Sequence, residues 1–273
     1  MTDFAYDFLE IRRADDLLWV TLANPKKANA LSPAMLAEVT DLYRRPLREE
    51  GIRAVFLSGA GKHFSAGADL GHLESLQHAG PEDNARDSQA LKELFAAVLY
   101  QPALTVALVH GSCIAGGCGL ATAHDYVVAE RNARFMYSEV RIGFVAALVA
   151  TFLSLRVKGR DLRELLLDPQ LVDAEQALEL GLVNRVIDAA DTTTGDPADA
   201  LAMAGEDLVS GILERASSES IARTKGLLLD VVGRPLADAL ERAAEVNAAS
   251  RATDDCRHGI ATFLETKRPP TWR

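Results

Sequence analysis

The sequence predicts an α/β core followed by a helical region, on three observations. Short β-branched runs alternate with helical patterns over the first two thirds of the chain. A polar segment at 188–197, reading DAADTTTGDP, is the best candidate for a linker because it contains Gly and Pro and lacks large apolar residues. The remainder is rich in Ala, Leu, Glu and Arg and reads almost wholly helical. We therefore divide the chain into a core at 1–190 and a helical region at 198–273.

The order of elements can be followed along the chain. Strands are expected at the short apolar runs 17–22, 54–59, 105–110 and 125–130. A helix is expected to start at Ser32, an N-cap followed by Pro33, and to end near Leu47. One face of this helix carries its apolar residues, namely Met35, Leu36, Val39 and Leu42.

Further helices follow from periodicity and capping signals. Asp173 and Gln176 resemble a capping box, and Gly181 is expected to end the helix that they begin. Other helical patterns cover 87–100, 198–213, 217–232 and 235–264. Alternating strands and helices predict parallel pairing, but periodicity does not distinguish a doubly wound sheet from a spiral of turns.

Composition narrows the classes of protein. The 273 residues are 48% hydrophobic and 25% charged, which is typical of a chain that buries a sizeable core. No stretch approaches the roughly 20 apolar residues that cross a bilayer, and the acidic N-terminus is unlike a signal peptide, so we expect a cytoplasmic protein. The net charge of -10 argues against nucleic acid as the partner. Cys113, Cys118 and Cys256 indicate neither a disulfide framework nor a metal site.

Two turns that contain glycine are candidates for a functional site. They are the first glycine turn, HFSAGADL at 63–70, and the second glycine turn, GSCIAGGCGL at 111–120. If both direct N–H groups at one place, they form an oxyanion hole that stabilises charge on a carbonyl oxygen. Glycine clusters more often serve turns and close packing, so either turn alone is weak evidence. Glu139, taken alone, is most simply a solvated carboxylate.

Other polar residues near these turns are expected to have structural roles. His63 and His124 lie at predicted element ends, where exposed or capping positions are expected, and Asp69 and Asp125 are expected to hold turns or helix ends. Ser65 lacks the His and Asp pattern of a serine hydrolase, and the second glycine turn is not the GxGxxG pattern of a dinucleotide site.

These segments occur in order with NPKKANAL at 24–31, LGLVNRVI at 180–187, ARTKGLL at 222–228 and GIATFLETKRPPTW at 259–272. In this combination the sequence resembles the crotonase (enoyl-CoA hydratase/isomerase) superfamily over nearly its whole length. The resemblance implies a spiral of ββα turns with a C-terminal helical trimerisation region, commonly doubled into a hexamer. It also implies an acyl-CoA thioester substrate and no separate cofactor.

The resemblance assigns roles to individual residues. It places the oxyanion N–H groups on Ala66 and Gly116 and the acid/base on Glu139. Lys26 and Ala28 are placed near the adenine of coenzyme A, and Lys267 near a nucleotide phosphate. The complete set implied for substrate binding is Lys26, Ala28, Ala66, Gly67, Ala68, Asp69, Leu70, Gly116 and Gly119.

Two departures from the family pattern affect the expected reaction. Family hydratases typically carry a second glutamate at the position of Gly119, and many relatives have a Pro-Gly pair where this chain has Val145–Ala147. We expect hydration of a 2-enoyl-CoA with Glu139 as acid/base. The single glutamate favours a Δ3,Δ2-enoyl-CoA isomerase as the alternative, and a third hypothesis is an acyl-CoA-binding assembly protein without catalysis.

Overall fold

The computed structural model describes residues 5–191, 195–251, 253–266 and 270–272. In these parts of the chain the main sheet has the strand order β1-β2-β3-β4-β6-β9. All neighbouring strands in it are parallel except the antiparallel pair β1 and β2. Its strands are β1 (Leu9–Ala14), β2 (Leu17–Leu22), β3 (Ala54–Gly59), β4 (Leu104–Val109), β6 (Tyr126–Glu130) and β9 (Arg185–Ile187). The α/β prediction is confirmed.

A smaller sheet and a set of helices complete the described parts. The small sheet consists of β5 (Ser112–Ile114), β7 (Arg134–Met136) and β8 (Val172–Asp173). The helices of the core are α1 (Pro33–Arg44), α2 (Leu70–Leu76), α3 (Pro81–Leu99), α4 (Gly116–Thr122), α5 (Ala147–Leu153), α6 (Gly159–Leu167) and α7 (Ala174–Glu179). The C-terminal helices are α8 (Pro197–Arg215), α9 (Ser218–Asp230), α10 (Leu236–Arg251) and α11 (Asp254–Thr266). Short 3-10 turns are η1 (Pro25–Lys27), η2 (Glu139–Ile142) and η3 (Ala189–Asp191).

Helices cover both faces of the main sheet, which explains why β4 is buried at all six residues. On one face, α1, α3 and α4 pack over a large apolar cluster that includes Leu36, Leu94 and Leu120. On the other face, α8 contributes Leu201 and its neighbours to a second cluster with Phe56 of β3.

The predicted capping signals are present. Ser32 Oγ accepts a hydrogen bond from the Met35 N–H at 3.3 Å and begins α1. Asp173 and Gln176 form the expected capping box at the start of α7. Gly181 follows α7 with a φ of 83°, a left-handed conformation that ends the helix without steric cost.

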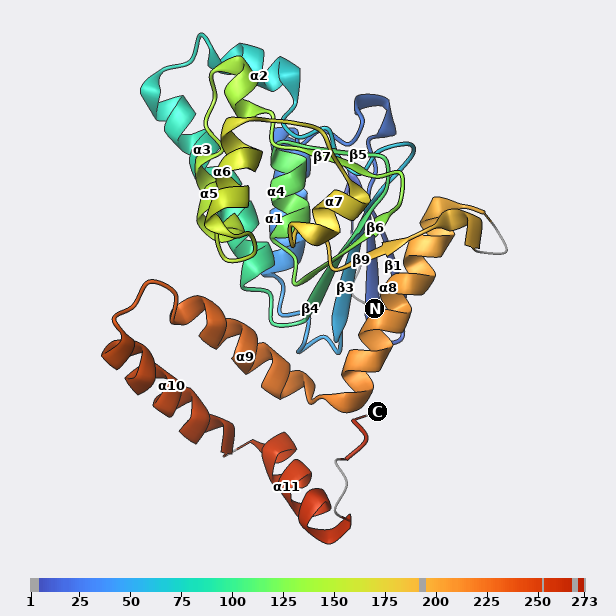
Figure 1. Cartoon of the computed structure of the whole chain (residues 1–273), viewed down its shortest axis with the longest axis vertical. Helices are drawn as coiled ribbons and strands as arrows, with labels where there is room; N and C mark the ends of the chain where they lie inside the picture. Colours follow the sequence, from blue (N-terminus) through green and yellow to red (C-terminus); the bar gives the residue numbers. More distant parts are fainter. Residues whose placement is uncertain (1–4, 192–194, 252, 267–269, 273) are drawn as a thin grey trace.

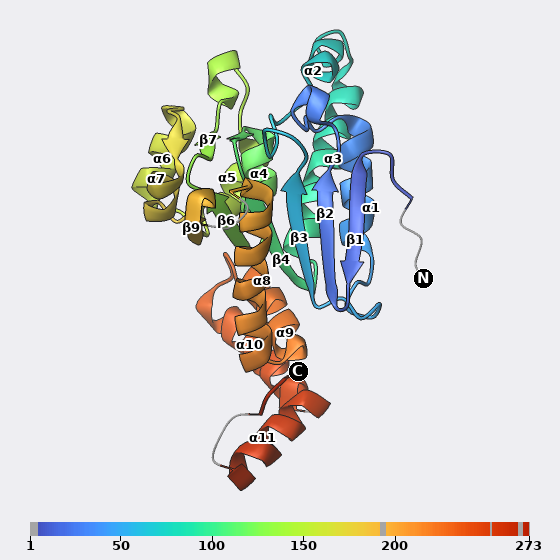
Figure 2. The ribbon, with the colours of Figure 1, turned by 90° about the vertical axis from the view of Figure 1, so that its right-hand side faces the viewer.

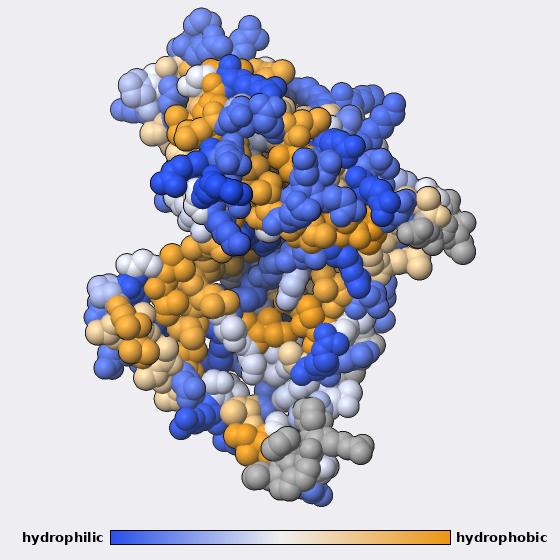
Figure 3. Space-filling model, viewed as in Figure 1, coloured by the Kyte–Doolittle hydropathy of each residue, from blue (hydrophilic) through white to orange (hydrophobic). Residues whose placement is uncertain are grey.

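The C-terminal helices divide into two parts. α8 packs against the sheet and belongs to the core, whereas α9, α10 and α11 extend away from it (Figures 1 and 2). The single helical pattern expected at 235–264 is in fact two helices, α10 and α11. Apolar side chains gather along α9 (Figure 3), and the exposed large apolar residues of α9, α10 and their connection include Leu228, Val232, Leu236 and Leu240.

None of the helices in the described ranges is both long enough and apolar enough to cross a membrane.

The contact between α8 and the sheet gives the first prediction. A Cβ at Gly205 would lie 2.9 Å from Leu108 Cδ2 and 3.1 Å from Phe56 Cε1, so Gly205→Ala should overpack this contact and lower the free energy of unfolding by about 1–3 kcal/mol. Gly226→Ala is the matched control in α9, since a Cβ there meets nothing within 4 Å and should raise helix stability by about 0.5–1 kcal/mol. Denaturant unfolding at one fixed protein concentration measures both. Equal stability of the two variants would contradict the described packing of α8.

Candidate active site

The two glycine turns lie side by side in the folded chain. Ser65 N donates to Ser112 O at 3.2 Å, and Ile114 N donates to Ser65 O at 3.0 Å. Gly67 has a φ of 83°, and a Cβ there would lie 2.6 Å from Ile114 O and 3.2 Å from Gly116 N. Only glycine fits this close approach, which brings the backbones of the two turns together.

A buried asparagine holds the neighbouring loop against the first glycine turn. Asn29 Nδ2 donates to Ala60 O at 2.9 Å and to His63 O at 2.8 Å, and its Oδ1 accepts from Asn24 N at 3.0 Å. Ala28 and Asn29 both have positive φ, at 49° and 52°, which the Asn29 hydrogen bonds stabilise. The NP-x-x-x-NAL segment therefore acts as a brace for the turn that follows β3.

One of the two backbone N–H groups that were expected to bind a carbonyl oxygen is not free in the structure. Ala66 N donates to Ala28 O at 2.9 Å, so this N–H is already used within the fold and is not available to a carbonyl oxygen. Gly116 is the first residue of α4, where an N–H has no acceptor within its own helix. Among the residues that the structure describes, neither Gly116 N nor Ala68 N has a hydrogen-bond acceptor. The geometry therefore argues against Ala66 and for Ala68 as the partner of Gly116.

Glu139 carries a buried carboxyl oxygen without a partner. It is the first residue of η2, three residues after the end of β7, and its Oε2 has no hydrogen-bond partner among the described residues. Burial raises the pKa of Glu139 above its ordinary value, and a backbone hydrogen bond opposes the shift. A carboxyl group with a raised pKa and one oxygen that has no hydrogen-bond partner is suited to proton transfer.

Apolar side chains fill the space beside Gly119. This glycine is buried, and a Cβ there would lie 2.7 Å from Val149 Cγ2 and 2.9 Å from Phe95 Cζ. Val149 comes from α5, which begins at Ala147, the last residue of the unusual VAA segment. The ring of Phe95 also packs on Phe152, with 5.2 Å between the centroids. The packing leaves no space for a glutamate at position 119, which the sequence alone did not reveal.

Asp69 has a structural partner on each side. Its side chain accepts from His72 N at 3.1 Å and caps α2, and it pairs with Lys27 Nζ at 2.7 Å. The hydrogen bond from Lys27, together with the cap, lowers the pKa of Asp69. Asp69 therefore stays ionised and holds the turn, as expected. Lys26 and Leu70 are exposed next to this turn, and Lys267 lies outside the described residues.

The two histidines near the glycine turns also have structural partners. His63 Nδ1 accepts from Ser112 N at 3.2 Å. His124 is buried, and its ring contacts Leu120 O at the end of α4, so of the two expected roles it has the capping one. Ser65 Oγ donates to Asn29 O at 2.8 Å and is likewise structural.

Two N–H groups without an acceptor thus lie at adjacent turns, and Glu139, on a later segment, has one buried carboxyl oxygen without a hydrogen-bond partner among the described residues. The family model described as enoyl-CoA hydratase/isomerase matches residues 12–273. The chain therefore belongs to the enoyl-CoA hydratase/isomerase (crotonase) family.

Individual relatives agree with this assignment. A Thermus thermophilus protein named "Putative enoyl-CoA hydratase" is 43% identical over 251 residues, 92% of this chain and 95% of that protein. The human mitochondrial Delta(3,5)-Delta(2,4)-dienoyl-CoA isomerase is 32% identical over 282 residues, 98% of this chain and 83% of that protein. The solved structure of Mycobacterium smegmatis enoyl-CoA hydratase superposes with a TM-score of 0.85 at 31% identity, covering 97% of this chain and 98% of that one. The fold is thus the α/β crotonase fold.

The buried carboxyl group predicts an unusual pH dependence of stability. Because the folded state raises the pKa of Glu139, the folded protein binds this proton more tightly than the unfolded chain does. The contribution of Glu139 to the free energy of unfolding therefore falls as pH rises above the ordinary glutamate pKa of about 4.3. Glu139→Gln should be more stable than the wild type at neutral pH, and the difference should shrink as pH is lowered.

Denaturant unfolding of both proteins over a pH series measures this difference. Glu219→Gln is the matched control with the opposite sign, because the hydrogen bond from Arg48 lowers the pKa of Glu219. That variant should lose stability at neutral pH. A Glu139→Gln variant that is less stable than the wild type at neutral pH would show that the carboxylate has a stabilising partner.

Proposed function

We propose that the protein is an acyl-CoA enzyme that moves a proton through an enolate, with Glu139 as its single acid/base. The reaction that the geometry supports best is the isomerisation of a 3-enoyl-CoA to a 2-enoyl-CoA. The observation that carries this choice is the packing at Gly119, where Phe95 and Val149 occupy the space beside the backbone. One carboxyl group is sufficient for a proton shuttle, whereas a second one that helps to hold and deprotonate water has no room at this position.

The proposed steps follow from the chemistry of a thioester. The N–H groups of Ala68 and Gly116 donate hydrogen bonds to the thioester carbonyl oxygen. The Glu139 carboxylate removes a proton from Cα of the 3-enoyl-CoA, and the electrons of the C–H bond delocalise to form a dienolate with its charge on that oxygen. The Glu139 carboxylic acid then returns the proton to Cγ, and the double bond forms between Cα and Cβ. The raised pKa of Glu139 brings the acid and base forms closer in energy near neutral pH.

Hydration of a 2-enoyl-CoA is the second candidate, and the names of the Thermus and Mycobacterium relatives favour it. In this reaction the water oxygen adds to Cβ, Glu139 takes the proton of that water, and the same proton is delivered to Cα. Backbone groups would have to hold the water in place of a second carboxylate.

We propose that the rest of the substrate binds along the first glycine turn and the loop that lies beside it. Lys26 and Ala28 are proposed near the adenine, and the run 66–70 along the pantetheine, with Asp69 acting as the support of the turn. In this proposal Ala66 contributes through its position and not through its N–H. Coenzyme A belongs to the substrate, so no separate cofactor is required. A cytoplasmic location stays a prediction, since the human relative is mitochondrial.

The experiment that tests the function is incubation of the pure protein with crotonyl-CoA and with a 3-enoyl-CoA in deuterated water, followed by mass spectrometry and NMR. We expect the 3-enoyl-CoA to become a 2-enoyl-CoA with less than one deuterium per turnover, because one carboxyl group carries the same proton out and back. Glu139→Gln should lower kcat by about a thousandfold or more and leave affinity for the thioester within a few fold.

Each alternative has its own outcome in this experiment. Rapid conversion of crotonyl-CoA to the 3-hydroxy product, with slow isomerisation, would establish a hydratase with one glutamate and overturn the preferred reaction. Thioester binding without turnover of either substrate would favour an acyl-CoA-binding protein that lacks catalysis. Full activity of the Glu139→Gln variant would remove Glu139 from the mechanism.

We further propose that the C-terminal helices assemble the chain into a trimer or a hexamer. The exposed Leu228, Leu236 and Leu240 side chains of α9 and α10 offer apolar surface that a second copy would cover. Light scattering should give three or six times the mass of one chain, and the double variant Leu236→Glu/Leu240→Glu should shift this mass towards the single chain. A monomeric wild type would contradict the proposal.

A further inference from the structure

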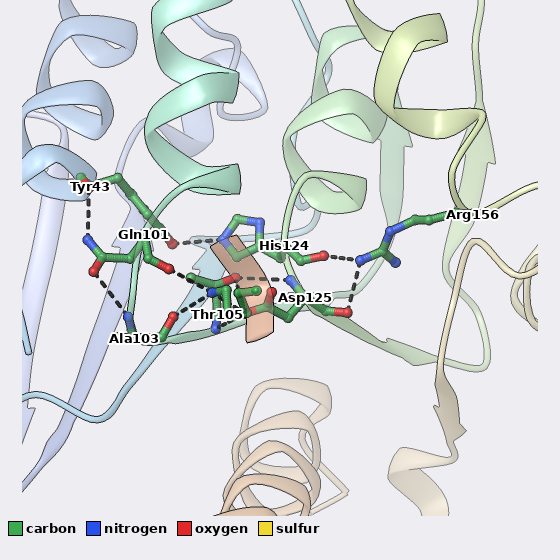
Figure 4. Close-up of polar contacts among 8 residues, drawn as sticks. Tyr43, Gln101, Ala103, Thr105, His124, Asp125 and Arg156 are labelled. Carbon is green, nitrogen blue, oxygen red and sulfur yellow. Dashed lines mark hydrogen bonds and ion pairs between the residues drawn. The ribbon is translucent and has the colours of Figure 1, made fainter. Parts of the chain in front are cut away.

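A buried polar network lies below α4, at the end opposite Gly116 (Figure 4). α4 ends at Thr122 with Ala123 as its C-cap, and His124 and Asp125 come next. His124 Nδ1 lies 2.8 Å from Leu120 O, and its Nε2 lies 2.7 Å from the hydroxyl oxygen of Tyr43. Burial lowers the pKa of His124 to about 3, so the ring is neutral. Since a carbonyl only accepts, Nδ1 carries the hydrogen and the Tyr43 hydroxyl donates to Nε2.

Lys225 connects this network to the C-terminal helices. It lies in α9, and its ammonium group donates to Gln101 O and Ala103 O at 2.7 Å each and to Asp125 Oδ2 at 2.5 Å. These three bonds use all the hydrogens of the ammonium group. The side chain is 13% exposed, so the contact is shielded from water. It joins α9 to the loop before β4 and to Asp125, which lies between α4 and β6.

The segment after α4 is held from several directions. Asp125 Oδ2 also accepts from Thr105 N at 2.8 Å and from Thr105 Oγ1 at 3.0 Å. The Arg156 guanidinium, which follows α5, donates to the carbonyl oxygens of His124 and Asp125. Figure 4 shows these contacts converging on His124 and Asp125. Residues 124–125 are thus contacted from β4, from the segment after α5 and from α9.

Because α4 is short, the contacts at its C-terminal end can affect the position of Gly116 at its N-terminal end. Its seven residues span only about 10 Å, and a helix transmits an axial shift from one end to the other because its hydrogen-bonded turns are stiff. Without the Lys225 ammonium, the Asp125 carboxylate and two main-chain carbonyls would be left in a shielded site without that donor. Burying such groups is unfavourable, so the segment after α4 would move towards water or towards other donors.

We propose that Lys225 is a positioning residue for the reaction. It fixes the end of α4 so that the N–H of Gly116 stays directed at the thioester carbonyl oxygen, and it links that N–H to the C-terminal helices. This inference rests on the proposed function, in which Gly116 is an oxyanion donor.

The test compares Lys225→Met with Arg223→Met. Methionine keeps much of the length of the lysine side chain without its charge. Arg223 lies on the same helix but pairs with Glu219 at the surface, at 2.7 Å, and serves as the matched control. For each variant we would measure kcat, KM and the infrared carbonyl stretch of bound butyryl-CoA labelled with carbon-13 at the thioester carbon. Hydrogen bonds to the carbonyl oxygen lower this frequency, so the band reports the oxyanion donors directly.

We expect Lys225→Met to lower kcat by about ten- to a hundredfold with KM within threefold, because a small displacement of a donor costs this much. The carbonyl band of its bound thioester should move back towards the frequency of free butyryl-CoA. Arg223→Met should match the wild type in both measurements. If Lys225→Met does not fold, the double variant Lys225→Met/Asp125→Asn removes the unpaired carboxylate as well, and it should show the same two changes.

A fall in kcat with the carbonyl band at its wild-type frequency would overturn the inference, because Lys225 would then act on stability alone. Unchanged kcat and an unchanged band would overturn it as well. Failure of the proposed function looks different: the wild type would turn over neither enoyl-CoA, while the band of bound butyryl-CoA would still show whether Lys225 positions the donors.

Discussion

The close approach of the two glycine turns is the constraint on which the site depends. Gly67 leaves no room for a side chain against Ile114 O and Gly116 N, and this contact sets the Ala68 and Gly116 amides near each other. Asn29 braces the first turn, and α4 begins at the second. Both turns follow strands of a sheet that is packed on both faces, so the core of the protein holds the two turns in place. The fold thereby holds the two N–H donors in position in advance, so they need not move during the proposed reaction.

Glu139 shows the energetic cost of such a site. Most of the ionisable groups near the glycine turns have structural partners, as Asp69 has in Lys27, but the buried Oε2 of Glu139 has none among the described residues. Burial is unfavourable to the charged form and raises the pKa of Glu139, and a raised pKa is the property that the proposed role in proton transfer needs. Beside Gly119, by contrast, the chain fills space with Phe95 and Val149. The Glu139 carboxyl group therefore lowers the stability of the fold, whereas apolar side chains pack at position 119, where family hydratases typically carry a second glutamate.

Much of this arrangement could be predicted from sequence. Strong local signals identified β2, β3, α1 and the capping box of α7, and the ordered motifs identified the family. Features that depend on tertiary contacts were missed, because periodicity carries no information on them: the antiparallel strand β1, the short strands of the small sheet and the packing of α8 on the core. The use of the Ala66 N–H by Ala28 O and the packing of Phe95 against Gly119 join residues distant in sequence. No local pattern records either contact.

The central claim is that the Ala68 and Gly116 amides and the Glu139 carboxyl group act on one thioester. A crystal structure of the protein with bound butyryl-CoA tests it most directly. The account predicts a thioester carbonyl oxygen within hydrogen-bonding distance of both amide nitrogens, with the Glu139 carboxyl group next to Cα. A carbonyl oxygen bonded elsewhere, or a Glu139 side chain directed away from the acyl group, would contradict it.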